Sequence, residues 1–453
     1  MSYKILSLDG GGSWALIQAR ILQDIYGDIQ GHELLRKFDL VIANSGGSLV
    51  LACLCNNMRL SEIISVFKTE SKRKKIFVRL KANEHSLLSL ARSIFKSLTI
   101  GPKYSAAKKR SGLVDVLSEY DHHTKIGLPI VKTPISKLPK IVGKESLQIV
   151  IVAFDYFKER ATFFRSNKES KTDKFNKKYY DVTLGDAIHA SSNAPVNYFQ
   201  EYAKVDLEYR QLSEREKKLN WYWDGAVAGF NNPVLAGLIE AMTNEPNRPL
   251  EDFKILSIGT GQKGKTVIVD QKYSEGNPVI VDRYKKNKDK KYILSHDSRK
   301  FKLEIAKMAQ SILSDPPDSA TFIAYSILNR GLENNANLVR INPCVTPQLD
   351  KASNEYILPD AYKMEMEKFM DILDLDMDAV EDKQVDLISD LAEKFIVDDP
   401  AAPYVPNQFI RGENEGDAKL GFSSYREAKK RWLEIGMFKT GENKVIPQPK
   451  QNI

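Results

Sequence analysis

Residues 39–52 read Asp-Leu-Val-Ile-Ala-Asn-Ser-Gly-Gly-Ser-Leu-Val-Leu-Ala, and they decide the fold. An apolar run before Ser45 favours a buried strand, and a second apolar run soon after it favours a buried helix. Gly46 and Gly47 supply the backbone freedom that so tight a turn requires. A strand–serine–helix turn of this kind presents the hydroxyl at the carboxyl edge of a sheet, above the free N–H groups of the helix N-terminus. The stretch therefore predicts an α/β fold with a serine placed to attack an ester.

The same serine has a plainer interpretation, because serine is also a favoured N-cap residue of helices. The general nucleophile-elbow pattern is Gly-x-Ser-x-Gly, and Ala43 stands in place of its first glycine. Taken alone, the turn leaves both interpretations of Ser45 open, and the rest of the chain must distinguish them.

The composition is that of an ordinary globular protein. The 453 residues are 42% hydrophobic and 28% charged, which suffices for one large domain or for two or three smaller ones. The formal net charge of +8 favours contact with an anionic surface, either phospholipid headgroups or nucleic acid. A specific nucleic-acid partner is not expected.

Cysteine content and apolar runs bear on the compartment. Three cysteines without a Cys-x-x-Cys pair argue against a disulfide framework and a structural zinc site, and they favour a reducing compartment such as the cytoplasm. Residues 1–8 are too short for a signal peptide. The longest apolar run, around residues 49–55, is far shorter than the roughly 18–20 residues that span a bilayer. We therefore expect a cytoplasmic protein that meets a membrane only peripherally.

The order of the predicted elements indicates a mostly parallel sheet with helices on its faces. A strand at 3–8 runs into a glycine triplet, a helix follows from Ser13, and a second strand at 38–44 leads to Ser45. Later strands and helices are expected at 147–154, 161–165, 183–191, 234–242, 253–258, 300–313, 318–329, 338–341 and 361–396.

Composition shifts suggest how the chain is divided. The basic, proline-punctuated residues 59–145 are expected to form a helical insertion over the core, and the Lys-rich residues 262–298 a long loop. We expect an α/β domain over residues 1–345, with its core motifs between 3 and 262. Residues 346–453 would form a helical extension that ends in an irregular tail of about 50 residues.

Two glycine-rich loops also match nucleotide-binding patterns. Residues 10–15, Gly-Gly-Gly-Ser-Trp-Ala, match G-x-G-x-x-[GA]. That motif needs an acidic residue at the end of the second strand, whereas Asp39 lies at the start of this one. Residues 259–266 match the P-loop pattern with Lys265 as its lysine, but the β-branched and polar residues that follow do not favour the helix that a P-loop opens. Nucleotide hydrolysis is therefore the weaker alternative.

The glycine triplet, Ser45 and Asp224 each follow a predicted strand, so all three are expected at the carboxyl edge where doubly wound sheets bind ligands. Glycine N–H groups at that edge are unhindered by side chains and could form an oxyanion hole. Ser45 would be the nucleophile and Asp224 the base. None of the six histidines follows a strand as a triad histidine should, and His189 is interpreted as a structural residue. A Ser–Asp dyad explains these residues better than a triad.

With these residues in place, the sequence resembles the patatin-like phospholipases, a family of lipid acyl hydrolases. The resemblance runs from about residue 3 to 262 and rests on motifs in the family's order. The motifs are Leu8-Asp9-Gly10-Gly11-Gly12, Ala43-Asn44-Ser45-Gly46-Gly47, Ala190-Ser191-Ser192-Asn193-Ala194-Pro195 with Tyr198-Phe199, Asp224-Gly225-Ala226 leading to Asn231-Asn232-Pro233, and Leu256-Ser257-Ile258-Gly259-Thr260-Gly261.

The resemblance implies a three-layer α/β/α hydrolase fold with a mostly parallel central sheet and a helical C-terminal region. It implies a phospholipase A-type reaction on the fatty-acyl esters of membrane phospholipids, with Ser45 as nucleophile and Asp224 as base. The implied oxyanion hole is the backbone of Gly10–Gly12, helped by the Gly46 N–H. Neither a metal nor an organic cofactor is expected.

Several positions depart from the family's pattern. Trp14 and Ala15 stand where members usually carry Arg or Lys and then Gly, so headgroup recognition would be altered or supplied by another cation. Ala43 and Ala226 replace glycines but leave the serine and the carboxylate in place. These departures keep a second function open, a non-catalytic lipid- or nucleotide-sensing protein on the same scaffold.

The expected partner is a phospholipid membrane surface. Basic clusters at 72–75, 108–110 and 285–291 could dock the chain on anionic lipid, at about 1 kcal/mol per well-placed cation. Any single cluster could equally be a solvated surface. The resemblance also suggests a toxin or defence effector that a small molecule or a protein switches on. Residues 346–453 are the candidate region for that control. The oligomeric state is not predicted.

Overall fold

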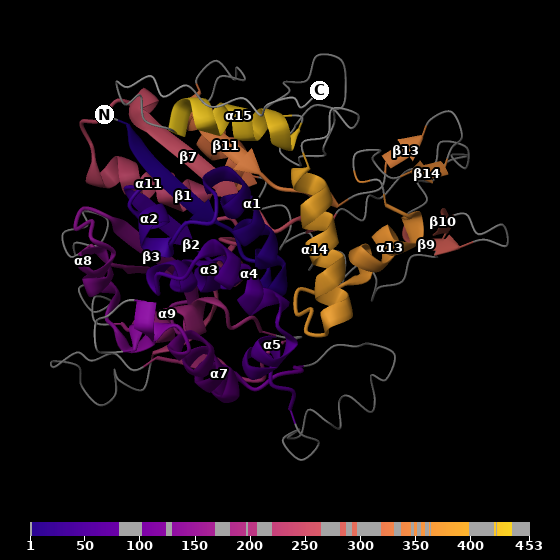
Figure 1. Cartoon of the computed structure of the whole chain (residues 1–453), viewed down its shortest axis with the longest axis horizontal. Coiled ribbons are helices and arrows are strands. Elements are labelled where there is room, and N and C mark those ends of the chain that lie inside the picture. Colours follow the sequence, from indigo (N-terminus) through magenta and orange to yellow (C-terminus); the bar gives the residue numbers. More distant parts are fainter. Residues whose placement is uncertain are drawn as a thin grey trace, which may run out of the picture.

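An eight-stranded sheet forms the centre of the structure, which is a computed structural model (Figure 1). The strand order is β11-β7-β1-β2-β3-β6-β5, and β4 pairs with β3 outside this path. The strands are β1 (Tyr3–Leu8), β2 (Leu40–Ala43), β3 (Gln148–Asp155), β4 (Arg160–Arg165), β5 (Ala203–Lys204), β6 (Trp221–Asp224), β7 (Phe253–Ile258) and β11 (Leu338–Ile341). Strands β11, β7, β1, β2 and β3 are parallel to one another, whereas β4 and β6 run antiparallel to β3. The prediction of a mostly parallel sheet is confirmed.

The structure describes residues 2–80, 102–123, 129–167, 182–195, 198–205, 220–263, 281–286, 292–296, 319–329, 337–345, 348–350, 355–357, 362, 364–397, 421–422 and 424–436. The helix expected at 300–313 lies outside these residues.

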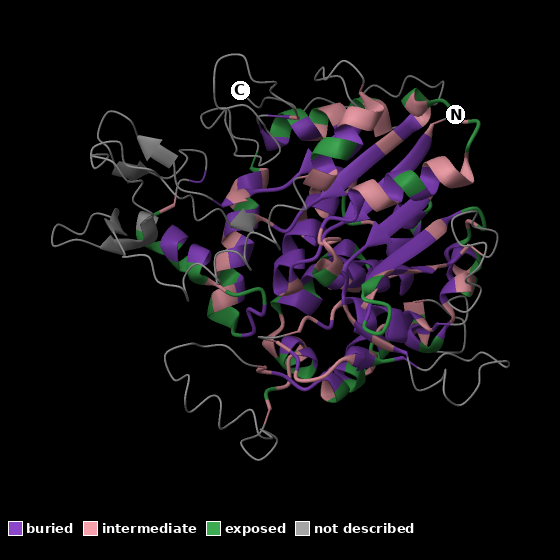
Figure 2. Cartoon of the chain, turned by 180° about the vertical axis from the view of Figure 1, so that it is seen from behind, coloured by how far each residue is buried: buried purple, intermediate pink, exposed green. Residues whose placement is uncertain are grey.

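The two faces of the sheet bury two separate apolar cores, so the fold has three layers. Alternation along β1 sends Ile5 into one core and Leu6 into the other. The larger core lies under α1 (Leu16–Tyr26), α3 (Ser45–Cys55), α4 (Leu60–Lys68) and α9 (Leu184–Ser191). The smaller lies under α11 (Val234–Asn244) and the helical residues 319–328. The strands between these layers are buried almost throughout (Figure 2).

The region between β2 and β3 is helical, as expected. It contains α4, α5 (Glu70–Ile76), α7 (Ala106–Ser118) and α8 (Leu138–Val142), joined by short 3-10 turns. Two other expectations are wrong. The polar stretch 262–298 includes an antiparallel pair, β9 (Val281–Lys286) with β10 (Tyr292–His296). The tail expected to be irregular includes the helix α15 (Tyr425–Gly436).

Helices from the C-terminal part pack on the same sheet layer. Helix α14 (Asp382–Ile396) lies beside α1 and α4, and α15 crosses the sheet beside β7 and β11 (Figure 1). Trp432 of α15 stacks on Phe38 with 6.1 Å between ring centroids, and its indole N–H donates to the Tyr26 hydroxyl at 2.7 Å. These helices therefore share the core of the sheet. No helix within the described ranges is long and apolar enough to cross a bilayer.

Candidate active site

The carboxyl ends of β2 and β6 face each other along one flank of β3. Strand β2 places Ala43 opposite Ile151, and β6 places Asp224 opposite Ala153. Because β4 occupies the other flank of β3 over both stretches, β2 and β6 share one flank and approach end to end. The two ends are two residues apart along β3, about 7 Å. Ser45, just after β2, and Asp224 therefore converge.

The direction of β6 differs from what the sequence predicts. The motif order predicts that Asp224 follows a strand ending at the carboxyl edge of a doubly wound sheet, but β6 runs antiparallel to its neighbour β3. The carboxyl end of β6 meets Ser45 because β6 approaches from beyond the carboxyl edge of the parallel strands. The predicted pair is thus brought together by a geometry that the order of motifs did not reveal.

Ser45 occupies a sharp turn. Its φ of 49° lies in the left-handed region, which is uncommon for a residue other than glycine. The Ser45 N–H donates to Ser191 Oγ at 2.9 Å, and Ser48 Oγ donates to the Ser45 carbonyl at 2.6 Å. These bonds hold a backbone conformation that typically costs about 1–3 kcal/mol. Such strain at a strand-to-helix turn is the geometry of a nucleophile elbow.

Asp224 is a buried carboxylate with few partners. Its Oδ1 accepts from Asn44 Nδ2 at 3.0 Å and from the Ala226 N–H at 2.9 Å. Burial raises the pKa of the carboxyl above its ordinary value, although hydrogen bonds from Ser45, Ala226 and Asn44 and the nearby Lys109 ammonium each lower it. A raised pKa makes the carboxylate a better proton acceptor than an exposed aspartate.

The glycine triplet lies against the start of α3. A Cβ added to Gly46 would lie 2.6 Å from the Gly12 carbonyl oxygen and 2.8 Å from the Gly12 nitrogen, so the two backbones are in contact. Among the described residues, no hydrogen bond is made by the N–H groups of Gly11, Gly12 or Gly46. The Gly10 N–H, in contrast, donates to the Asn231 carbonyl at 2.8 Å. Gly10 is therefore corrected from a free donor to a close packing position, and three donors remain.

A buried ion pair fixes the root of this loop. Asp9 and Arg340 form a bidentate pair, with Nη1–Oδ1 and Nη2–Oδ2 distances of 2.9 and 2.5 Å, and both side chains are 4% exposed. The Asp9 carbonyl accepts from the Gly47 N–H at 3.1 Å and from Gln18 Nε2 at 2.9 Å. Thr260 Oγ1 donates to the Gly10 carbonyl at 2.7 Å. The loop is held from four separate elements.

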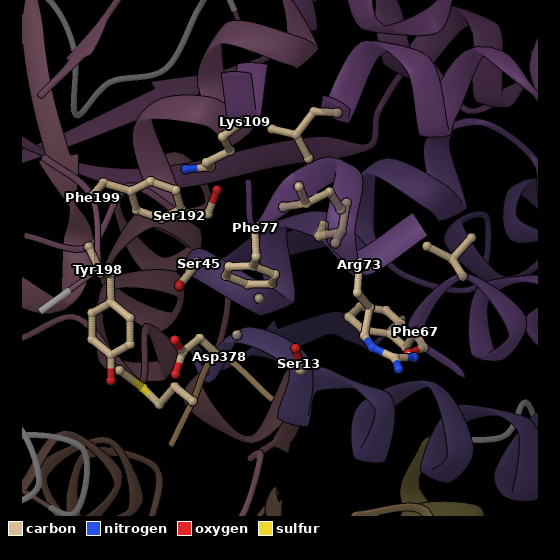
Figure 3. A pocket seen from close by; sticks show the side chains of 18 residues that line it. Ser13, Ser45, Phe67, Arg73, Phe77, Lys109, Ser192, Tyr198, Phe199 and Asp378 are labelled. Carbon is tan, nitrogen blue, oxygen red and sulfur yellow. The ribbon is translucent and has the colours of Figure 1, made fainter. Parts of the chain in front are cut away.

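A mainly apolar pocket of about 700 Å³, a volume that includes its open mouth, adjoins Ser45. Figure 3 shows the Ser45 hydroxyl among the rings of Phe77, Tyr198 and Phe199. The lining residues are Gly12, Ser13, Ser45, Gly46, Leu49, Val66, Phe67, Arg73, Ile76, Phe77, Lys109, Leu113, Ser192, Ala194, Tyr198, Phe199, Met377 and Asp378. The pocket suits a hydrocarbon chain.

Residues 376–380, between α13 (Met366–Asp374) and α14, form one wall of the pocket. The Met377 carbonyl accepts from the Ser13 N–H at 2.9 Å, directly after the glycine triplet. Tyr104 donates to the Asp378 carboxylate at 2.5 Å, and Lys103 Nζ lies 2.7 Å from Asp376 and 3.2 Å from Asp378. The 376–380 segment thus ties the C-terminal helices to the active-site wall.

The two departures from the family's pattern have structural counterparts. Trp14 is buried, and its indole N–H donates to the Asp376 carbonyl at 3.1 Å, so it anchors the 376–380 segment. Ala15 faces Gly46, since a Cβ added to Gly46 would lie 3.1 Å from the Ala15 Cβ. Trp14 therefore takes a structural place in this chain.

Lys109 is a cation in the pocket that the sequence analysis missed. Its side chain is 1% exposed, its Nζ donates to the His189 carbonyl at 3.0 Å, and it lies 4.5 Å from the centre of the Phe199 ring. No described carboxylate forms an ion pair with it. Burial holds the pKa of Lys109 well below its ordinary value, and Asp224 raises it in part.

His189, His32 and His123 have partners other than Ser45 and Asp224. His189 is buried in α9, and burial together with Lys109 and Arg110 holds its pKa well below the ordinary value. His32 bonds to the Cys55 carbonyl, and His123 lies 3.3 Å from Glu62. The structural interpretation of His189 fits its burial.

The P-loop pattern does not have the required context either. After β7 and Gly261, the chain enters the short strand β8 (Gln262–Lys263), which pairs with β12 (Cys344–Val345), where a P-loop would open a helix. Lys265 lies outside the described residues. Thr260 instead supports the glycine loop. No group of three or more potential ligands from His, Cys, Asp and Glu gathers to hold a metal in the described ranges.

Ser45, Asp224 and the glycine loop thus lie together on a three-layer α/β/α fold, and comparison with known proteins assigns the family. The profile of the family described as "Patatin-like phospholipase" matches residues 6–238. The chain belongs to the patatin-like phospholipases, and it is thereby a lipid acyl hydrolase at the level of the family.

The similar solved structures are distant. VipD from Legionella pneumophila shares 10% identity over 86% of this chain and 67% of its own, with a TM-score of 0.31. The type III effector protein ExoU shares 14% identity over 42% of this chain and 40% of its own, with a TM-score of 0.23. The chain therefore spans less than half of ExoU. No curated protein sequence matches it.

Proposed function

We propose that this protein is a phospholipase A-type serine hydrolase that releases fatty acid from membrane phospholipids through the dyad Ser45–Asp224. The observation that carries the proposal is the convergence of a strained serine, which lines an apolar pocket, with a buried carboxylate. The raised pKa of Asp224 supports its role as base. The N–H groups of Gly11, Gly12 and Gly46, which donate to no described residue, support the role of oxyanion hole.

In the acylation step, Asp224 takes the proton of the Ser45 hydroxyl while Oγ attacks the acyl carbonyl carbon. The carbonyl oxygen gains a negative charge, and the N–H groups of Gly11, Gly12 and Gly46 bind it. Collapse of the tetrahedral intermediate breaks the ester C–O bond. The leaving oxygen takes the proton from Asp224 and departs as lysophospholipid.

In the deacylation step, water attacks the acyl-serine carbonyl and Asp224 takes a proton from that water. Collapse then releases the fatty acid, and Ser45 Oγ recovers its proton from Asp224. The apolar side chains of the pocket, among them Leu49, Val66 and Leu113, would hold the hydrocarbon chain throughout. A small-molecule or protein activator would act through the 376–380 segment, because that segment joins the C-terminal helices to the pocket wall.

The function is tested by fatty-acid release from mixed phospholipid vesicles and by labelling with a fluorophosphonate, which reacts with activated serines. We expect the wild type to be labelled and to release fatty acid, and Ser45→Ala to do neither. Ser65→Ala is the control, since Ser65 is an exposed serine of α4 that is not among the residues lining the pocket. Labelling without release would mean a competent hydrolase that awaits an activator. Absence of both would favour the sensing function, and ATP turnover lost in Lys265→Ala would favour the P-loop reading.

A pH measurement tests the charge on Lys109. Lys109→Met removes a cation that lowers the pKa of Asp224, so that pKa should rise further. Since Asp224 accepts a proton only when ionised, the acid limb of the pH–rate profile should move to higher pH. Lys108→Met, on the same helix, should leave the limb in place. If the acid limb of Lys109→Met has the same midpoint as that of the wild type, the charge of Lys109 does not affect the pKa of Asp224.

A further inference from the structure

Aromatic side chains gather where β3, β5 and β6 extend past the active site. Tyr156 and Phe157 follow β3 and are 44% and 43% exposed, and Tyr202, Trp221 and Trp223 are partly exposed. We call these five residues the aromatic cluster. Large aromatic side chains exposed together on a protein surface typically mark a binding site.

The rings form one continuous group. Tyr202 stacks on Trp221 with 3.8 Å between centroids and an interplanar angle of 10°. Phe157 lies 4.8 Å from Trp221, Tyr156 lies 5.5 Å from Tyr202, and Tyr202 lies 6.2 Å from Trp223. The stacked pair forms a rigid base, and Tyr156 and Phe157 project from it towards solvent.

The aromatic cluster is continuous with the active site. Trp221 precedes Asp224 by three positions on β6, a distance of about 10 Å along the strand. Trp223 packs against the group that includes Tyr198 and Phe199, which line the pocket. The aromatic cluster is therefore joined through Trp223 to the aromatic lining of the pocket.

The charges around the aromatic cluster balance one another. Lys158 pairs with Asp155 at 2.9 Å, and Lys204 pairs with Glu201 at 3.4 Å. Glu159 in the turn after β3 and Arg160 at the start of β4 are exposed neighbours. Among the residues that the structure describes, the charges beside the aromatic cluster therefore balance, and we attribute its attraction for a surface to its aromatic rings.

We propose that the aromatic cluster seats this protein on the phospholipid surface that supplies its substrate. The proposal rests on the proposed function. Tyr and Trp favour the interface between headgroups and hydrocarbon, because one part of the ring system is apolar and the other forms hydrogen bonds. A protein seated this way needs no anionic lipid. The pocket lined by Tyr198 and Phe199 is then held near the membrane that supplies its acyl chains.

The test separates binding from catalysis by using the Ser45→Ala protein. Co-sedimentation with zwitterionic phosphatidylcholine vesicles should show binding that changes little between 0.1 and 0.5 M salt, values chosen around the screening range of exposed charges. Adding Tyr156→Ser and Phe157→Ser should lower the vesicle partition coefficient at least about tenfold, given the interfacial preference of the lost rings. The matched control is Ile239→Ser with Val397→Ser, which removes two apolar side chains of similar exposure.

Other outcomes overturn the proposal. Binding that requires anionic lipid, disappears in high salt and survives loss of Tyr156 and Phe157 would assign docking to the basic clusters. Absence of vesicle binding would favour a protein partner for the aromatic cluster. Hydrolysis of a soluble short-chain ester by the Tyr156→Ser/Phe157→Ser variant in a Ser45 background separates this proposal from the proposed function. If the protein binds vesicles through the aromatic cluster but hydrolyses no ester, the docking proposal is supported and the proposed enzymatic function is contradicted.

Discussion

Replacement of Asp224 by Asn is expected to lower the rate of fatty-acid release about 10²–10⁴-fold, the range that a positioned general base contributes. The side chain keeps its size, and its oxygen can still accept the hydrogen bonds from Asn44 and Ala226. What is lost is the negative charge that takes the Ser45 proton. The variant should therefore fold like the wild type and bind lipid equally well while its turnover falls.

A matched control is available on the neighbouring strand. Asp155 at the end of β3 is also buried, and its Oδ1 accepts the N–H groups of Phe157 at 3.1 Å and Lys158 at 3.0 Å. Asp155→Asn should keep its activity on a soluble short-chain ester, because Asp155 lies away from Ser45. Equal losses in Asp155→Asn and Asp224→Asn would mean that the amide disturbs the fold, and the dyad would lose its support.

The pH dependence supplies a second check on the same residue. Burial raises the pKa of Asp224 above its ordinary value, and only the ionised form can act as base. The rate should therefore fall as the pH is lowered through that raised pKa, at a higher pH than for an exposed aspartate. In Asp224→Asn the residual rate should lack this acid limb. An acid limb of the same midpoint in Asp224→Asn would assign it to another group.

The residues that could be predicted from sequence are those whose chemistry is local. Ser45 is set by a strand, two glycines and a helix within a dozen positions, and the Gly10–Gly12 loop by a strand and a capping residue. Strand and helix positions in the sheet follow from apolar runs in the same way. Asp224 was recognised by its motif, but the antiparallel direction of β6 is decided by pairing with β3 and has no signal of its own.

The residues that were missed act over long sequence separations. Arg340 reaches Asp9 across 331 positions and Trp14 reaches Asp376 across 362, and nothing near either residue indicates its partner. Lys109 was assigned to a surface cluster because basic runs are usually solvated, yet it faces the pocket while Arg110 beside it is exposed. The β9–β10 pair was missed since polar, Lys-rich strands resemble loops in composition.

Replacement of Arg340 by Met is expected to lower the free energy of unfolding by about 3–5 kcal/mol, because it leaves the Asp9 carboxylate buried without its countercharge. Urea unfolding followed by circular dichroism measures the change. The matched control is Arg20→Met, which breaks an ion pair with Glu393 at a similar distance of 2.7 Å but with side chains 22% and 52% exposed. That loss should be about 0–1 kcal/mol, as for other surface pairs.

The double variant Asp9→Leu/Arg340→Met distinguishes the charge from the packing. Removing both charges removes the buried carboxylate that Arg340 no longer neutralises, so much of the stability should return. The carbonyl of residue 9 still accepts from Gly47 and Gln18, since these bonds use the backbone. If the pair serves mainly to place the glycine loop, turnover should stay low in the double variant even where stability recovers. If stability and turnover both recover, the ion pair contributes to stability alone. The geometry of the glycine loop would then be set by Thr260, Gln18 and the contact with Gly46.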